Sequence, residues 1–110
     1  MPYNENLAGR VREQLSDEQG ITEKGMFGGL AFQLEGNMAV GVSGDELTVR
    51  VSPEKADDAL AEPHARPFGS KGRPMKGWIV VAEEGVEGEK ELAGWVARGV
   101  EHARSLPPKG

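Results

Sequence analysis

The feature that most constrains the fold of this sequence is a strict alternation of apolar residues between positions 30 and 51. Three short runs place an apolar side chain at every second position, and turn-forming residues separate the runs at 35–37 and 43–45. The alternating residues are Leu30, Phe32 and Leu34, then Met38, Val40 and Val42, then Leu47, Val49 and Val51. A period of two puts these side chains on one face of a sheet. The pattern predicts an antiparallel three-stranded meander with one apolar face.

The opposite face of the predicted meander carries small or weakly polar side chains in its first two strands. These residues are Ala31, Gln33, Ala39 and Gly41. A face of this composition favours coverage by a further layer, a ligand or a second copy of the chain. Gly28 and Gly29 interrupt the alternation where the first strand begins, which predicts a β-bulge or a close backbone approach there.

Two segments near the ends of the sequence have the period of an amphipathic helix. From residue 4 to about residue 17, apolar residues recur at every fourth position, with Asn4 as a candidate N-cap and Gly20 as the stop. From about residue 89 to residue 105, apolar residues recur three and four positions apart. Both segments are therefore predicted to be helices with one apolar face.

The second of these helices contains two glycines, Gly94 and Gly99. A glycine inside a helix costs about 1 kcal/mol relative to alanine. We therefore expect close packing against the sheet or another helix to require a small residue at both positions.

The middle of the chain predicts a short helix, an irregular segment and a further strand. Ser52 followed by Pro53 is typical of a helix start, and this helix is expected to end before Pro63. Residues 63–76 contain three prolines and two glycines, which predicts a long irregular loop of the kind that is often functional. Residues 77–82 are apolar on both alternating sets, which predicts an inner strand buried on both faces.

Together these elements predict a two-layer α+β fold in the order α-β-β-β-α-β-α. Its antiparallel sheet is expected to have about four to five strands, with N- and C-terminal helices and a short middle helix. A chain of 110 residues is about the length of one domain, so we expect a single domain over residues 1–110. The predicted core residues are Leu7, Val11, Leu15, Leu30, Phe32, Val40, Val42, Leu47, Val49, Ile79, Val81, Trp95, Val96 and Val100.

Composition excludes several kinds of site and location. The chain has no cysteine, which excludes disulfides, thiolate metal sites and cysteine nucleophiles. No apolar run approaches the roughly 18 residues that a membrane span needs, and the N-terminus lacks the basic and apolar regions of a signal peptide. We therefore expect a cytoplasmic protein with no membrane contact.

The sequence offers no recognisable catalytic, metal or cofactor motif. Its two histidines, His64 and His102, have no second histidine at metal-ligand spacing. Ser43 lies in a predicted hairpin turn and lacks the serine-elbow pattern. The glycine-rich segment 69–73 lacks the spacing of known phosphate-binding loops. We therefore expect a protein that is not an enzyme, with no catalytic residue, no metal ligand and no cofactor.

Positive charge is concentrated in one window of an otherwise acidic chain. The net charge is −5, while residues 64–78 contain four basic residues and no acid, which leaves −9 for the rest. We predict a binding surface formed by this window and one basic residue of the meander. It consists of Arg50, His64, Arg66, Lys71, Arg73 and Lys76. Such a cationic loop suits an acidic protein surface or a nucleic-acid backbone, and it is equally typical of a solvated loop folded over a sheet edge.

Three motifs carry a resemblance to a known family. They are Lys-Gly-Met-Phe-Gly-Gly-Leu-Ala-Phe at 24–32, Ser-Gly-Asp-Glu-Leu at 43–47 leading into Val-Arg-Val at 49–51, and Gly-Arg-Pro-Met-Lys-Gly at 72–77. In this order and separation they resemble the TfoX/Sxy N-terminal domain family, over residues from about 20 to 104. The resemblance implies an α+β fold whose antiparallel sheet is flanked by helices. It also implies a link to natural competence, in which two-domain members look like transcriptional co-regulators, and it implies no catalytic residues.

Three functions from different classes stay open at this point. The first is a regulatory or accessory domain that acts through a protein partner. The second is nucleic-acid binding by residues 64–76 together with Arg50, which the negative charge elsewhere opposes. The third is a small-ligand or self-association module, such as a homodimer, that uses the small residues Ala31, Ala39 and Gly41.

Overall fold

The computed structural model describes residues 3–26, 29–70 and 73–107. Within these ranges the chain forms three α-helices, two short 3₁₀ helices and a six-stranded antiparallel sheet. The helices are α1 (Glu5–Gln14), η1 (Pro53–Lys55), α2 (Ala56–Leu60), η2 (Glu83–Val86) and α3 (Glu89–Ser105). The strands are β1 (Ile21–Met26), β2 (Gly29–Leu34), β3 (Asn37–Ser43), β4 (Glu46–Arg50), β5 (Ala65–Ser70) and β6 (Arg73–Val81). Across the sheet the strand order is β1-β2-β3-β4-β6-β5.

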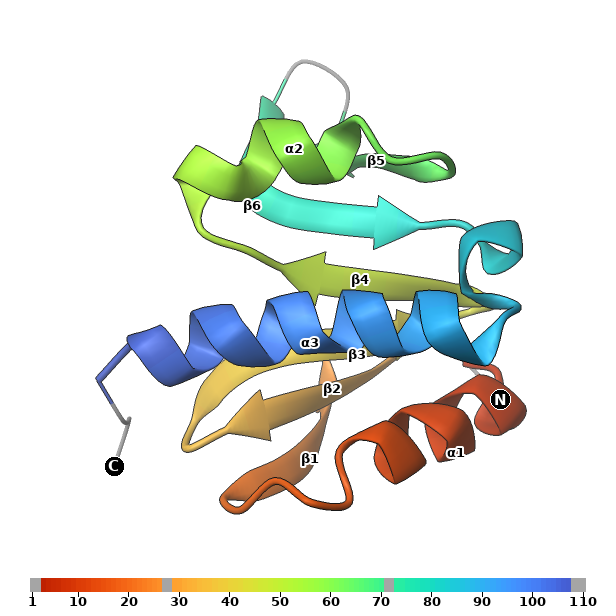
Figure 1. Ribbon diagram of the computed structural model, residues 1–110, viewed down its shortest axis with the longest axis vertical. Coiled ribbons are helices and arrows are strands. Elements are labelled where there is room, and N and C mark those ends of the chain that lie inside the picture. The colour runs from red at the N-terminus through yellow and green to blue at the C-terminus, as the bar shows by residue number, and fades with distance from the viewer. Residues whose placement is uncertain (1–2, 27–28, 71–72, 108–110) are drawn as a thin grey trace.

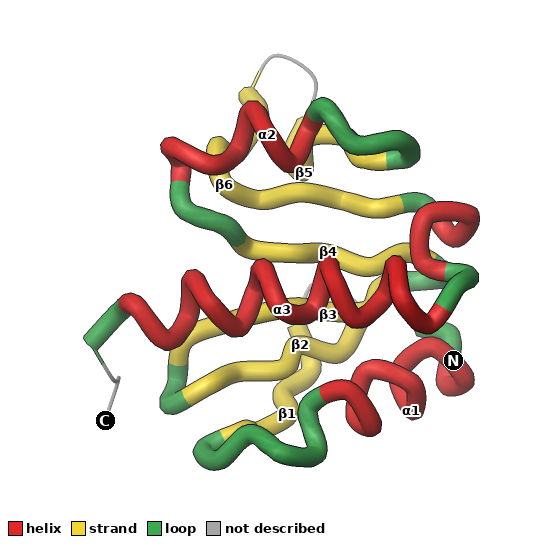
Figure 2. Tube along the Cα trace, in the orientation of Figure 1, coloured by secondary structure: helices red, strands yellow, loops and turns green. Residues whose placement is uncertain are grey.

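The sheet and the helices form two layers, as predicted (Figure 1). The helices α1, α2 and α3 lie over the same face of the sheet, with α3 packed on β3 and β4 and α2 packed on β6. Figure 2 shows the yellow strands extending behind the red helices from β1 to β5. The apolar core lies between the layers and contains side chains from each of the three α-helices.

The sheet has more strands than the four to five predicted. The additional strands are β1 and β5, and the element order of the described chain is α-β-β-β-β-α-β-β-α. Most of the segment 63–76 is therefore a β-hairpin and not the irregular loop that its prolines predicted. Both additional strands lie at the edges of the sheet. An edge strand tolerates a proline such as Pro67 because one of its sides is unpaired.

Helix α1 has the predicted N-cap. The side-chain oxygen Oδ1 of Asn4 accepts hydrogen bonds from the backbone N–H groups of Asn6 and Leu7, at 2.8 and 3.1 Å. The helix ends at Gln14, earlier than the end predicted near residue 17. Gly20 does not stop the helix. It lies directly before β1 with a φ of +82°, a left-handed conformation that glycine adopts without strain.

A bulge in β3 moves two residues away from their predicted faces. Phe32 pairs with Val40, but Gln33 pairs with Met38, so the register shifts between these two pairs. The extra residue, Ala39, belongs to the core together with Val40. Met38 lies on the opposite face, because one added residue reverses the parity of the side chains. The predicted faces of Met38 and Ala39 are therefore both wrong.

Close packing at glycine is confirmed at two of the predicted positions. A Cβ atom at Gly99 would lie 2.3 Å from the carbonyl oxygen of Ala39, so α3 closely approaches the backbone of β3. A Cβ atom at Gly29 in β2 would lie 2.2 Å from the carbonyl oxygen of Val42 in β3. The prediction is wrong for Gly94, where a Cβ atom would meet no atom within 4 Å. Gly28 lies outside the described residues.

The predicted core is confirmed except at one position. Each predicted core residue is buried apart from Leu30, which is partly buried and packs against the core. Strand β6 lies between β4 and β5, so it is an inner strand as predicted. Its residues Ile79 and Val81 belong to the core cluster beneath the helices. Its alternate residues Trp78 and Val80 therefore lie on the other side of the sheet.

Candidate interaction face

One face of the sheet is covered by no helix of the described residues, and we call it the helix-free face. It contains a shallow hollow of about 100 Å³ to which β2, β3, β4, β5 and β6 all contribute. From this face the hollow is lined by Ala31, Met38, Gly41, Thr48, Phe68 and Trp78. The register places Ala31, Gly41 and Thr48 side by side on neighbouring strands. These small residues leave room that the larger side chains around them enclose.

Two aromatic side chains and an arginine lie together at this hollow. The ring centroids of Phe68 and Trp78 are 6.0 Å apart, with the ring planes inclined by 39°. The guanidinium carbon of Arg50 lies 5.2 Å from the centroid of the Trp78 ring, which is a cation–π contact. Register explains the contact, because Arg50 of β4 pairs directly with Trp78 of β6. All three residues are partly exposed, so the cluster is accessible from the helix-free face.

The same face carries an ion pair between Arg66 of β5 and Glu46 of β4. The two guanidinium nitrogens of Arg66 donate to the two carboxylate oxygens of Glu46, at 2.7 and 2.6 Å. The hydrogen bonds from Arg66 lower the pKa of Glu46, and those same bonds raise the pKa of Arg66. The side chains are 52% and 37% exposed, so the pair contributes at most about 1 kcal/mol of stability.

Replacing Arg66 with glutamine should raise the pKa of Glu46 toward its ordinary value. Because the pKa of Glu46 is lower in the folded state, the pair stabilises the fold above the unfolded-state pKa. This stability is lost as the pH falls through the folded-state pKa, and the variant should lack that loss. An NMR titration of the side-chain carboxyl carbons measures the change. Arg12→Gln is the matched control, because it removes an equivalent bidentate contact to Glu23 and should leave the pKa of Glu46 unchanged. An unaltered pKa of Glu46 in Arg66→Gln would contradict the assignment.

The structure brings together only part of the predicted cationic surface. Arg50 and Arg66 both lie on the helix-free face. His64 is exposed with a φ of +69°, and its backbone carbonyl accepts the N–H of Ala82, so it lies beside η2 and outside the lining of the hollow. Arg73 and Lys76 belong to β6, and Lys71 lies outside the described residues.

Sequence reasoning missed the residues that define the hollow. Phe68 follows Pro67 and lies among basic residues, which indicated a loop. Met38 was placed on the apolar face of the meander because the bulge in β3 leaves no trace in the alternation of β3 itself. The available signal was in β6, where Ile79 and Val81 alternate with Trp78 and so predict that the indole lies on the opposite face.

Two kinds of feature are absent from the described residues. No group of three or more histidine, aspartate or glutamate side chains in the described ranges is arranged to hold a metal ion. No helix within those ranges has both the length and the apolar character needed to cross a membrane.

Comparison with known families gives one match. The model of the TfoX N-terminal domain family matches residues 13–103, which is most of the chain. The comparison with curated proteins gave no match. The matched range includes all six strands, α2 and most of α3, and therefore the whole of the helix-free face. The chain belongs to the TfoX N-terminal domain family.

Proposed function

We propose that this chain is a regulatory or accessory domain, not an enzyme, that acts by binding another protein on its helix-free face. Membership of the TfoX N-terminal domain family supports a competence-related regulatory role. The observation that carries the proposal is the partly exposed pair of Phe68 and Trp78 beside a hollow, with Arg50 stacked on the indole. Large aromatic residues and arginine are the side chains that most often dominate protein interfaces.

The chemistry of the face defines the kind of partner. A hollow of about 100 Å³ with small residues at its base can take one apolar side chain, since a cavity of about 150 Å³ holds a benzene molecule. The cationic group of Arg50 lies over Trp78, which lines the hollow, and favours a carboxylate next to that side chain. The partner is therefore a protein segment that presents an apolar anchor beside aspartate or glutamate.

Single-stranded nucleic acid is a second candidate for the same face. Aromatic rings on neighbouring strands, next to a guanidinium group, suit the stacking of unpaired bases. Against this candidate, Glu46 already accepts hydrogen bonds from both terminal nitrogens of Arg66, and the chain outside residues 64–78 has a charge of −9. A long-range field of that sign opposes a polyanion.

The proposal is tested by selecting partners from a displayed library of random peptides on the purified protein. We expect enriched peptides to contain an apolar residue next to aspartate or glutamate. The Arg50→Glu variant should not bind these peptides, because the substitution puts a negative charge where the partner's carboxylate binds. Arg12→Glu is the matched control, a charge reversal at an exposed arginine of α1, and it should select the same peptides as the wild type.

Two outcomes of the selection would contradict the proposal. One is the absence of any enriched motif. The other is enrichment of peptides that bind the wild type and Arg50→Glu equally well, which would place their binding elsewhere. Sedimentation at increasing protein concentration shows whether a second copy of the chain occupies the face instead, because the mass would then rise toward that of a dimer.

A further inference from the structure

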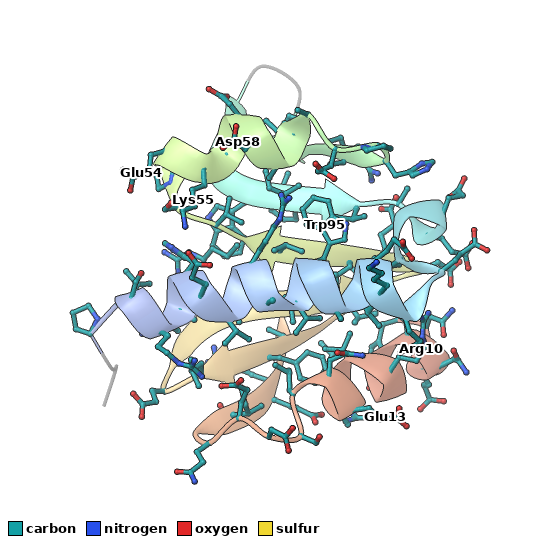
Figure 3. The ribbon with its side chains drawn as sticks, in the orientation of Figure 1. Arg10, Glu13, Glu54, Lys55, Asp58 and Trp95 are labelled. Carbon is teal, nitrogen blue, oxygen red and sulfur yellow. The ribbon has the colours of Figure 1, made fainter. Side chains whose placement is uncertain are left out.

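A second hollow lies in the helical layer, away from the helix-free face. It is a cleft of about 440 Å³ between the C-terminal half of α3 on one side and η1 with α2 on the other. In Figure 3 the labelled side chains Glu54, Lys55 and Asp58 project from the η1–α2 side of this region. Clefts of about 300–1,000 Å³ are typical of sites for small molecules, so this one has sufficient volume.

Two residues that line the cleft each have a buried polar atom with no hydrogen-bond partner within the described structure. These atoms are the hydroxyl oxygen of Ser52, directly before η1, and the ring nitrogen Nδ1 of His102 in α3. A buried polar group without a partner costs about 1–3 kcal/mol, and most such groups in folded proteins are satisfied. Both residues line the same cleft, where a polar ligand would supply the missing hydrogen bonds once the two side chains turn toward it.

The cleft contains one guanidinium whose acidic partner lies beyond hydrogen-bond distance. Arg98 of α3 lies over the ring of Trp95, 4.7 Å from its centroid, and this contact holds the side chain in place. It forms an ion pair with Glu62 at an N–O distance of 3.8 Å, which is beyond hydrogen-bond distance. By contrast, Lys55 and Glu101 are paired with each other across the cleft.

The imidazole of His102 is suited to form a hydrogen bond as an uncharged ring. Burial lowers the pKa of His102, and the nearby cation of Arg50 lowers it further. Near pH 7 the ring is therefore mostly neutral, so it adds a hydrogen-bonding nitrogen to the cleft without adding a charge. The hydroxyl of Ser52 likewise donates one hydrogen bond and carries no charge.

We propose that this cleft binds a small-molecule anion through a carboxylate or phosphate group, with Arg98 as the charged partner and Ser52 and His102 as neutral partners. Guanidinium groups bind both kinds of oxyanion well. The exposed carboxylates of Glu54 and Asp58 on the opposite wall oppose a polyanion and limit the ligand to a compact one. The proposal does not depend on protein docking at the helix-free face.

The site is tested by NMR titration of the labelled protein with inorganic phosphate and, separately, with acetate, at constant ionic strength. We expect saturable chemical-shift changes at Ser52 and His102 with at least one of the two anions. Changes with phosphate indicate a site for phosphate groups, and changes with acetate indicate a site for carboxylates. Arg98→Gln should weaken this binding at least tenfold. Arg104→Gln is the matched control, because it removes an exposed arginine of the same helix outside the cleft and should leave the affinity unchanged.

A second variant separates binding from structure. Because the hydroxyl of Ser52 has no partner, Ser52→Ala should be at least as stable as the wild type without added anion, yet bind the anion more weakly. A less stable Ser52→Ala with unchanged affinity would overturn the proposal. So would the absence of saturable shifts with both probes, or equal affinity in Arg98→Gln and Arg104→Gln.

Discussion

Replacing Phe32 with alanine should lower the free energy of unfolding by about 3–5 kcal/mol. Phe32 lies in β2 with no exposed surface, and it is among the largest fully buried side chains of the core. Truncation removes its transfer free energy and leaves a cavity between the sheet and the helices. Since domains of this size are stable by about 5–15 kcal/mol, such a loss brings the fold close to unfolding. Urea denaturation followed by circular dichroism measures the change.

Phe68→Ala provides the matched control for Phe32→Ala. It removes the same side chain from the helix-free face, where Phe68 is partly exposed and solvent can fill the space. We expect a clearly smaller loss of stability. Equal losses at the two positions, or a loss below about 1 kcal/mol at Phe32, would contradict the assignment of the two faces.

Alanine at the two glycines of α3 should have opposite effects. At Gly99 a Cβ atom would lie 2.3 Å from the carbonyl oxygen of Ala39 and 2.8 Å from the Cγ1 atom of Val40, so the helix must move off the sheet. We expect Gly99→Ala to destabilise the protein by about 1–3 kcal/mol despite the better helix propensity of alanine. At Gly94 the added methyl group meets nothing, and Gly94→Ala should stabilise the protein by up to about 1 kcal/mol.

Thermal and urea unfolding of the two variants measure this difference. Both substitutions add the same methyl group to the same helix, so the gain in helix propensity is the same for both. The difference between their free energies of unfolding therefore measures the contact of Gly99 with β3. Two variants of equal stability would contradict the close approach of α3 to the sheet.

Much of the fold follows from periodicity in the sequence. The alternation at 30–51 predicted β2, β3 and β4 because each of these strands buries one face against the helices. The four-residue spacing of Leu7, Val11 and Leu15 predicted α1 for the same reason. The edge strands were missed because the side chains of β1 are mostly exposed, and β5 contains a proline. Their strand structure comes from pairing with β2 and β6, which no local pattern reports.

Of the residues on the candidate face, only the charged ones could be predicted from the sequence. Arg50 and Arg66 are recognisable as cations in any sequence, and the structure places both on one face. The aromatic cluster depends on long-range register, since Phe68 and Trp78 come together only when β5 pairs with β6. Met38 lines the hollow only because β3 contains a bulge of a single residue. The hollow is therefore a property of the assembled sheet and not of any one segment.

The fold separates two binding chemistries onto its two layers. The helix-free face offers aromatic surface with cations beside it, which suits a protein partner. The cleft between α3 and α2 offers polar atoms without partners and one guanidinium, which suits a small anion. Arg50 lies near both sites, because it contacts Trp78 on one side of the sheet and influences the pKa of His102 on the other.

The central claim, that the helix-free face binds a protein segment, is tested most directly by the fluorescence of Trp78. The chain has two tryptophans, so Trp95→Phe leaves Trp78 as the single tryptophan, which can be excited selectively over Tyr3. We predict a saturable change in its emission when the acidic, apolar peptide from the selection is added, and no change with a single-stranded oligonucleotide. Unchanged emission while fluorescence anisotropy of a labelled peptide shows it to be bound would contradict the claim. A change produced by the oligonucleotide alone would assign the face to nucleic acid.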